Sequence, residues 1–398
     1  MGPDRRTVVG AGLAAGGGAL LTGCTTESTP TGSGSSSSSS TSRRSERRIG
    51  DGSTADTGPQ PHQPKPRRLR PGEVPPQFVV ISWDGAGEAS DQLFSHWRRV
   101  AKMHEVPMTF FLTGIYLLPG RERRRYRPPQ KPVGASDLGW LPERYVHATI
   151  RQTRKAWLEG HEIGTHFNGH FCGPKGVERW SVEDWLSEIE QAEEFVSTWR
   201  TTTGLTDEPP LPFDVRKEVV GGRTPCLEGV ANVRKAVAQL DWRYDSSGTR
   251  PATWPTKVEG LWDLSMQQVP FPGEDFEVTA MDYNFMANQS EVTDGPESMH
   301  DTWRTQTRDA YLAGFRRSLD GNRSPLVIGN HFEQWNGGIY MDAVEEAIEA
   351  MAEEPATRFV TMRQLCDWLD AQDEEVISRL QQLTGAPEDG WASYLRAG

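Results

Sequence analysis

The chain has 398 residues, a formal net charge of −12 and 14 tryptophans. This length allows one large α/β domain with tails. The acidic balance excludes a general electrostatic attraction to nucleic acid, so we expect no nucleic-acid partner. The four cysteines are too few and too widely spaced for a disulfide-dense scaffold or a cysteine-ligated zinc cluster.

The first residues are typical of an export signal. Arg5 and Arg6 precede a short, glycine-rich apolar run over residues 8–21, and the run ends shortly before Cys24. The run is too short to cross a bilayer as a stable helix, so we predict a signal peptide over residues 1–23. The arginine pair resembles a twin-arginine signal without its usual aromatic residue, and Sec export therefore stays open.

The segment Leu21-Thr22-Gly23-Cys24 resembles a bacterial lipobox. The resemblance implies cleavage before Cys24 and a diacylglycerol on its sulfur, with an unmodified cysteine as the alternative. A lipid there would anchor the exported chain to the outer face of the cytoplasmic membrane, facing the cell wall. Residues 24–76 are rich in Ser, Thr and Gly and then in Pro and Arg, a composition that predicts a disordered linker.

Beyond residue 76, short apolar runs alternate with longer amphipathic stretches. This alternation favours a parallel sheet with crossover helices, and we predict a distorted (β/α) barrel of about seven to eight strands over residues 77–372. The C-terminal tail, 373–398, has only a weak helical pattern. The expected strands are 78–82, 108–113, 162–166, 219–223, 242–246, 261–265, 326–331 and 359–362, and the expected helices include 182–199, 230–240, 311–319 and 344–352.

Polar residues stand at or just after the ends of four expected strands, at Asp84, His166, Arg223 and His331. The carboxyl ends of the strands of a barrel converge on one face, where catalytic groups gather. His166 and His170 are four residues apart, so on one helical turn both imidazoles would point the same way. The pair predicts a site for one divalent ion, and two unrelated surface or capping histidines are the alternative.

Several segments, in this order along the chain, resemble the motifs of the NodB-homology polysaccharide deacetylases, carbohydrate esterase family 4. They span about residues 77–372 and are Pro107-Met-Thr-Phe-Phe-Leu-Thr-Gly114, His161–His170, Arg223-Thr-Pro225, Trp242-Arg-Tyr-Asp-Ser-Ser247 and Leu326-Val-Ile-Gly-Asn-His331. The resemblance implies a NodB-like barrel and a divalent metal ion, Zn²⁺ in the first place and Co²⁺ or Ni²⁺ as alternatives.

The same resemblance implies a role for each candidate residue. His166 and His170 would bind the metal ion, Arg223 would orient the catalytic aspartate through an ion pair, and His331 would act as the general acid. In such a reaction a carboxylate takes the proton of the attacking water, and a histidine returns a proton to the departing group.

The first motif departs from the family pattern. The family has two adjacent aspartates after its first strand, one as base and one as metal ligand, whereas this chain has Ser82-Trp83-Asp84-Gly85. Asp84 aligns with the first aspartate, which favours it as the general base. The metal would then rest on the histidines with water or a distant carboxylate, for which Glu88 and Asp282 are candidates. Alternatively, Asp84 is the ligand and the base lies elsewhere.

The leading interpretation is a hydrolase that removes N-acetyl groups from a cell-wall or extracellular amino-sugar polysaccharide. The same residues could serve an O-acetyl esterase of the xylan type. A catalytically inactive, glycan-binding NodB-like lipoprotein is the third interpretation, because one aspartate is missing.

Four further residues stand close in sequence to the site motifs, and two of them, Cys172 and Cys226, would lie at the rim of the site. Cys172 and Cys226 follow the site motifs closely and are candidates for a disulfide in an oxidising exterior, with two free thiols as the alternative. Trp335 and Asn330 neighbour His331 in sequence and are candidates for substrate binding, with packing as the alternative reading for Trp335.

Overall fold

The structure, a computed structural model, describes residues 47–396. The predicted signal peptide, the lipidation site Cys24 and the first part of the predicted linker lie outside the described residues. Within the described residues no helix combines the length and the apolar character that crossing a bilayer requires.

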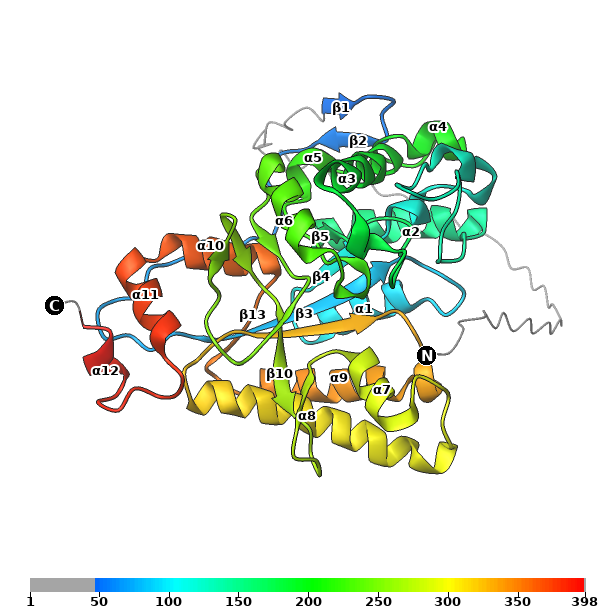
Figure 1. Ribbon diagram of the computed structural model, residues 1–398. Helices are drawn as coiled ribbons and strands as arrows, with labels where there is room; N and C mark the ends of the chain where they lie inside the picture. The colour runs from blue at the N-terminus through cyan, green and yellow to red at the C-terminus, as the bar shows by residue number, and fades with distance from the viewer. Residues whose placement is uncertain (1–46, 397–398) are drawn as a thin grey trace, which may run out of the picture. The chain divides into compact units, whose positions relative to one another are not determined.

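A parallel sheet of buried strands forms the centre of the molecule (Figure 1). β12 (Leu326–His331), β3 (Gln77–Ala86), β4 (Thr109–Leu112) and β5 (Glu162–Thr165) follow one another in this order, and β13 (Thr357–Phe359) pairs with the first residues of β3. Nearly every residue of β12, β3, β4 and β5 is buried, which is typical of a parallel sheet with both faces covered.

Short bridges carry the sheet around into a ring. Beyond β5, Thr165 bridges to Gly222, and Ser246 N donates to Gly222 O (3.0 Å) next to β6 (Tyr244–Asp245). β6 pairs in parallel with β9 (Leu261–Asp263), which leads into β10 (Met266–Pro270). On the far side Ala280 N donates to Gln267 O (2.8 Å), and Gly329 N donates to Ala280 O (2.9 Å). The ring confirms the predicted distorted barrel, although the expected strand over 219–223 is reduced to a single bridge.

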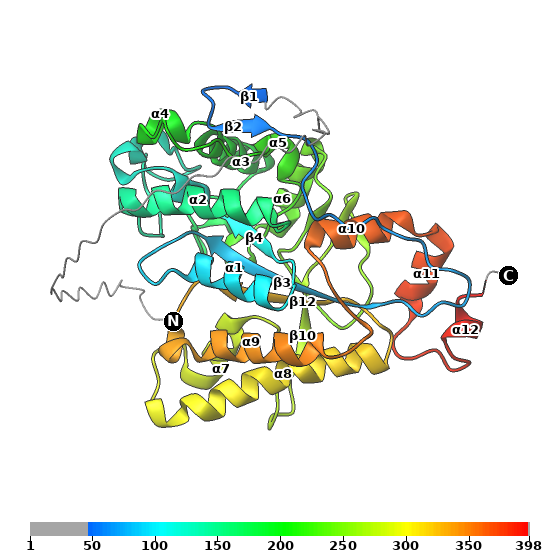
Figure 2. The ribbon, with the colours of Figure 1, turned by 180° about the vertical axis from the view of Figure 1, so that it is seen from behind.

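Amphipathic helices cover the barrel on opposite sides (Figures 1 and 2). α2 (Glu143–Leu158) and α3 (Val182–Ser197) lie on one side, and α8 (His300–Asp320) and α9 (Ile339–Ala352) lie together on the other. α3 begins at a capping box in which Ser181 and Asp184 satisfy each other's backbone N–H groups. The sequence predicted only the second half of α8, because its first half is polar.

The remaining elements are short or peripheral. They are α1 (Leu93–Met103), α4 (Trp199–Thr203), α5 (Val215–Glu218), α6 (Val230–Val237), α7 (Asp282–Ser290), β7 (Thr249–Arg250), β8 (Lys257–Val258) and β11 (Glu277–Thr279). Single 3₁₀ turns are at Gly114–Leu117, Gly120–Arg125, Val177–Arg179, Pro225–Leu227, Ala238–Leu240, Glu297–Met299 and Trp335–Gly338.

The predicted linker is wrong for residues 47–76, which pack on the barrel. β1 (Arg47–Ile49) and β2 (Thr54–Asp56) form a hairpin. Trp199 Nε1 donates to Ser53 O (2.8 Å), and Ala55 N donates to Leu211 O (2.8 Å). The segment is polar in composition, yet its backbone groups find hydrogen-bond partners on the barrel, which composition alone does not reveal.

The C-terminal tail is also part of the folded body. α10 (Met362–Ala371) is followed by α11 (Glu374–Gln382) and α12 (Trp391–Tyr394). Leu380 and Leu395 are buried in one apolar cluster with Phe78 and Trp368, whose rings lie 4.8 Å apart. No domain boundary therefore falls at residue 372.

The N-terminal segment of residues 47–76 should contribute measurably to stability. A chain that begins at Gln77 should unfold about 5 °C or more below a chain that begins at Arg47, because removal of this segment uncovers Trp199. Thermal unfolding followed by circular dichroism measures the difference. Equal unfolding temperatures for the two chains would contradict this assignment.

Candidate active site

The candidate residues meet at one edge of the sheet, where the parallel strands end. Asp84 stands near the end of β3, and His331, the last residue of β12, is its direct cross-strand partner in the register. His166 follows β5, and Arg223 follows the bridge at Gly222. The topology therefore brings together the four strand-end residues that the sequence singled out.

Arg223 is fully buried and binds its neighbours through all three guanidinium nitrogens. Nη1 donates to Asp84 Oδ1 (2.8 Å), Nη2 donates to the hydroxyls of Ser82 (3.0 Å) and Ser246 (2.8 Å), and Nε donates to Ser246 O (3.0 Å). The guanidinium also lies 4.9 Å from the centre of the Phe111 ring. A buried cation is stable only when its N–H groups have acceptors and an anion lies beside it. Asp84 is the only carboxylate partner of Arg223 among the described residues, so the ion pair holds Asp84 in place.

His331 is paired with Asp282, the first residue of α7. Its Nδ1 donates to Asp282 Oδ1 (2.7 Å), and its backbone N donates to Asp282 Oδ2 (2.7 Å). Burial by itself lowers the pKa of His331, but the charge and hydrogen bond of Asp282 outweigh it, and the net pKa is raised above the ordinary value. Because Nδ1 is engaged, Nε2 is the nitrogen that His331 can present to a substrate.

The two histidines of the predicted metal pair lie next to each other, with ring centres 5.1 Å apart. His166 Nδ1 donates to Arg223 O (2.8 Å), while its buried Nε2 has no hydrogen-bond partner. Burial lowers the pKa of His166 to about 3, and burial together with the neighbouring His166 lowers the pKa of His170 to about 3. Both rings are therefore neutral near pH 7, with lone pairs available to a metal ion.

His166 and His170 could provide two ligands of a divalent metal ion, but the described residues place no third ligand beside them. An orphaned Nε2 on an imidazole whose Nδ1 is held by a carbonyl is the usual arrangement of a metal-ligating histidine. Among the described residues, however, no carboxylate comes close enough to both His166 and His170 to complete a three-ligand group. The sulfur atoms of Cys172 and Cys226 lie near His170, but they are joined in a disulfide.

Both predicted substitute ligands have other roles. Glu88 is buried, and its carboxylate accepts a hydrogen bond from Ser95 N (2.8 Å) in the first turn of α1, where helix N–H groups need acceptors. Asp282 binds His331 instead of lying beside the metal pair. Gly85, at the position of the missing second aspartate, has a φ of 74°, and an added Cβ there would meet only Thr113 Oγ1, 3.9 Å away.

The loop that carries His170 is fixed from two directions. The disulfide between Cys172 and Cys226 joins this loop to the one after Arg223, with Cα atoms 6.0 Å apart. On the other side, Glu188 of α3 accepts a hydrogen bond from Asn168 N (3.1 Å). His170 itself has a φ of 53°, a left-handed conformation that costs a non-glycine residue on the order of 1 kcal/mol or more.

The two residues predicted to bind substrate are in different environments. Trp335 is half-buried, with its ring 5.2 Å from His331 and 5.8 Å from Tyr283, so it lies at the rim of the site. Asn330 is only 1% exposed, and its Nδ2 donates to Ser82 O (3.4 Å). Substrate binding stays a prediction for both residues, with Trp335 at the rim of the site and Asn330 buried in the sheet.

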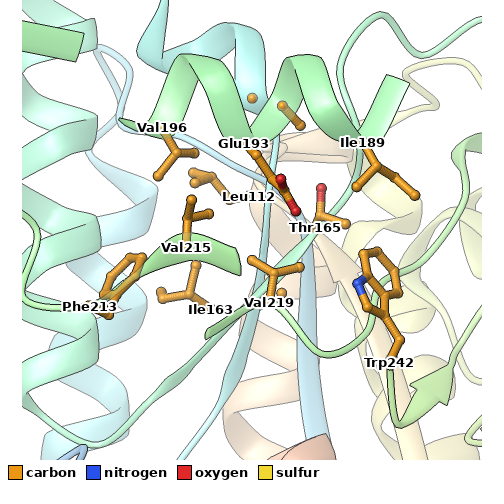
Figure 3. Close-up of a pocket in the computed structure, with 13 residues that line it drawn as sticks. Leu112, Ile163, Thr165, Ile189, Glu193, Val196, Phe213, Val215, Val219 and Trp242 are labelled. Carbon is orange, nitrogen blue, oxygen red and sulfur yellow. The ribbon is translucent and has the colours of Figure 1, made fainter. Parts of the chain in front are cut away.

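A separate small cavity lies between α3 and the strands β4 and β5 (Figure 3). Its volume is about 20 Å³, enough for roughly one water molecule, and apolar side chains such as Ile163, Val196 and Phe213 line it. It is a packing defect behind the strands and is too small for a sugar.

Sequence reasoning missed the residues that support the site. Ser82 and Ser246 bind Arg223, and Glu188 holds the His170 loop. Both serines lie inside motifs that the sequence marked, but a serine in a buried strand carries no sign of its partner. Glu188 lies on a helix remote in sequence, and only its burial reveals it.

Comparisons with known proteins give low similarity. No protein-family model matches the sequence, and no curated protein matches it. Among solved structures, a protein assigned as a polysaccharide deacetylase from Mycobacterium smegmatis is 15% identical, with a TM-score of 0.44 over 77% of this chain and 96% of its own. A polysaccharide deacetylase from Bacillus cereus is 12% identical, with a TM-score of 0.38 over 72% of this chain and 91% of its own. A family 4 acetyl xylan esterase from Clostridium thermocellum is 14% identical, with a TM-score of 0.38 over 72% and 89%.

The buried ion pair should be strongly coupled. Asp84→Asn should lower the free energy of unfolding by about 3 kcal/mol, because Arg223 becomes a buried cation without its anion. Urea unfolding of Asp84→Asn, Arg223→Met and the double variant measures the coupling. Glu375→Gln, which removes the partner of Arg379 at the surface, is the control and should cost less than about 1 kcal/mol. Additive costs for the buried pair would contradict the coupling.

Proposed function

We propose that this chain is a metal-dependent hydrolase that removes N-acetyl groups from a cell-wall or extracellular amino-sugar polysaccharide. The observation that carries the proposal is the pairing of two acid–base groups on adjacent strands: Asp84 held by Arg223, and His331 held by Asp282. Hydrolysis of an amide needs one group to take a proton and another to return it, and these two groups have opposite environments.

Asp84 is the general base of this proposal. Arg223 binds one oxygen of the carboxylate, and the other oxygen accepts no hydrogen bond from the described residues. The oxygen that Arg223 leaves free can take the proton of an attacking water. The direct partner of Asp84 in the register, His331, then stands on the neighbouring strand to protonate the departing amine.

His331 is suited to the acid role because Asp282 stabilises its imidazolium form. With Nδ1 engaged by Asp282, the proton on Nε2 is the one delivered. Asp282 itself is a positioning residue, since it acts on the substrate only through His331. The proposed base and the proposed acid thus stand near the ends of two neighbouring strands.

His166 and His170 would hold the divalent ion, Zn²⁺ in the first place with Co²⁺ or Ni²⁺ as alternatives. A bound ion of this kind supplies Lewis-acid polarisation of the acetyl carbonyl and lowers the pKa of a bound water. The chain's own contribution is to keep both imidazoles neutral and to fix the orientation of His166 through Arg223 O.

The polymer substrate is supported by the rim of the site. The Trp335 ring stands beside His331 and Tyr283, and an aromatic face of this kind can stack on a sugar ring. The proposal also places the chain outside the cell on a lipid at Cys24, on the strength of the N-terminal sequence. An O-acetyl esterase acting on xylan-type glycans would use the same groups.

A glycan-binding protein without activity is the second candidate function. It is favoured by Gly85, which stands where a second carboxylate would complete the metal site, and by the lack of any substitute among the described residues. In that case the barrel and its aromatic rim would bind sugar without hydrolysing it.

Metal content and acetate release separate these functions. In a chain of residues 47–398, His166→Ala should lower the bound Zn²⁺ by about one ion per chain, and the unaltered chain should release acetate from N-acetylglucosamine oligomers only when metal is present. His331→Ala should keep the metal and lose most of the turnover. Release from acetylated xylan alone would indicate the esterase. The same Zn²⁺ content in His166→Ala and the unaltered chain, together with no acetate release, would indicate the binding protein.

The pairing of His331 with Asp282 predicts how the activity depends on pH. Burial lowers the pKa of His331, and the Asp282 carboxylate raises it further than burial lowers it, so the acid stays protonated to higher pH. Asp282→Asn should therefore move the alkaline limb of the kcat/KM profile to lower pH while metal content stays unchanged. An alkaline limb at the same pH in both proteins would refute the role given to Asp282.

A further inference from the structure

A second group of metal-ligating side chains lies away from the active site, between α1 and α9. His104 follows the last turn of α1, and Glu345 and Glu349 are one turn apart on α9. One ligand atom from each of these three residues lies within 4.8 Å of the other two. His96 of α1 also lies near Glu345, with Nε2 3.7 Å from Oε2.

The distance between His104 and Glu349 is too long for a good hydrogen bond and close to the spacing of two ligands on one metal ion. His104 Nε2 lies 3.7 Å from Glu349 Oε1, beyond the roughly 3.2 Å limit of a good N–H···O bond. Two ligands on one tetrahedral Zn²⁺, at bond lengths of about 2.0–2.2 Å, are roughly 3.3 Å apart. A small side-chain rotation would therefore bring the three atoms onto one ion.

His104 has an unsatisfied ring nitrogen that points to the same conclusion. Its side chain is only 15% exposed, and Nε2 is buried without a hydrogen-bond partner. A buried polar atom without a partner costs on the order of 1–3 kcal/mol. Glu349, at 57% exposed, leaves the group open to solvent on one side, so an ion can enter.

Among the described residues, Glu345 and Glu349 have no basic partner of the kind that Glu346 has. Glu346, on the same helix, is paired with Arg304 and Arg308. Glu345 and Glu349 have no lysine or arginine partner among the described residues, and like charges one helical turn apart repel each other. A divalent cation between them would remove that repulsion and satisfy His104 at the same time.

We propose that His104, Glu345 and Glu349 form a second, structural site for a divalent transition-metal ion, Zn²⁺ above all, with His96 supporting Glu345. Nitrogen and carboxylate ligands in this number suit Zn²⁺ better than Ca²⁺ or Mg²⁺, which take oxygen ligands. The ion would join α1, which follows the strand of Asp84, to α9, which follows the strand of His331. It would thereby brace the two elements that lead away from the proposed base and acid.

The test removes the active-site pair first, so that the two sites are read separately. In the His166→Ala/His170→Ala protein, dialysis against micromolar Zn²⁺ should leave about one Zn²⁺ per chain by elemental analysis. The same ion should raise the unfolding temperature by a few degrees over that in EDTA, because it binds only the folded state. Dialysis against Mg²⁺ at the same concentration should leave no bound Mg²⁺ and should not raise the unfolding temperature.

Variants of the second site decide the outcome. In that background His104→Ala and, separately, the exposed Glu349→Gln should abolish both the bound Zn²⁺ and its effect on the unfolding temperature. Glu353→Gln, an exposed glutamate at the end of the same helix, is the matched control and should change neither. Glu349→Gln keeps the test valid if His104→Ala fails to fold.

Two results would overturn the proposal. One is that the His166→Ala/His170→Ala protein holds no more Zn²⁺ after dialysis against Zn²⁺ than after dialysis against Mg²⁺. The other is that Zn²⁺ and its thermal effect persist in Glu349→Gln. Neither result depends on whether the chain is a deacetylase, since no activity is measured.

Discussion

The arrangement of the site depends on one buried charge, the guanidinium of Arg223. Taking a cation out of water is costly, and the cost is met only when a carboxylate and enough acceptors surround it. Asp84, Ser82 and Ser246 provide them from two strand regions, β3 and the end of β6. The same residue gives its carbonyl oxygen to His166, so the proposed base and one proposed metal ligand are positioned by a single side chain and its backbone.

A second pair complements the first on the neighbouring strand. The register of β3 and β12 places His331 opposite Asp84, and Asp282 comes to His331 from α7. Asp84 is held by a cation, whereas His331 is held by an anion that favours its protonated form. Two groups with opposite proton demands thus stand side by side, which a reaction that moves a proton from water to a leaving group requires.

The metal half of the site is less complete than the acid–base half. His166 and His170 are neutral, adjacent and fixed by a carbonyl, a disulfide and the loop held by Glu188. Gly85 contributes no carboxylate, and Glu88 is committed to the first turn of α1. The proposed catalytic function therefore depends on how strongly two imidazoles alone would bind a metal ion.

The sequence by itself determined the α/β class, the barrel and the strand-end residues, because hydrophobic alternation and polar residues after strands are local patterns. It placed the linker boundary too late, since residues 47–56 are polar and become ordered only through Trp199 and Leu211. It also gave Glu88 and Asp282 as substitute ligands, whereas tertiary structure directs one to a helix end and the other to His331. A carboxylate's role depends on which donor the fold brings to it. For Glu88 that donor is Ser95, in the helix that follows directly, whereas for Asp282 it is His331, which a distant strand supplies.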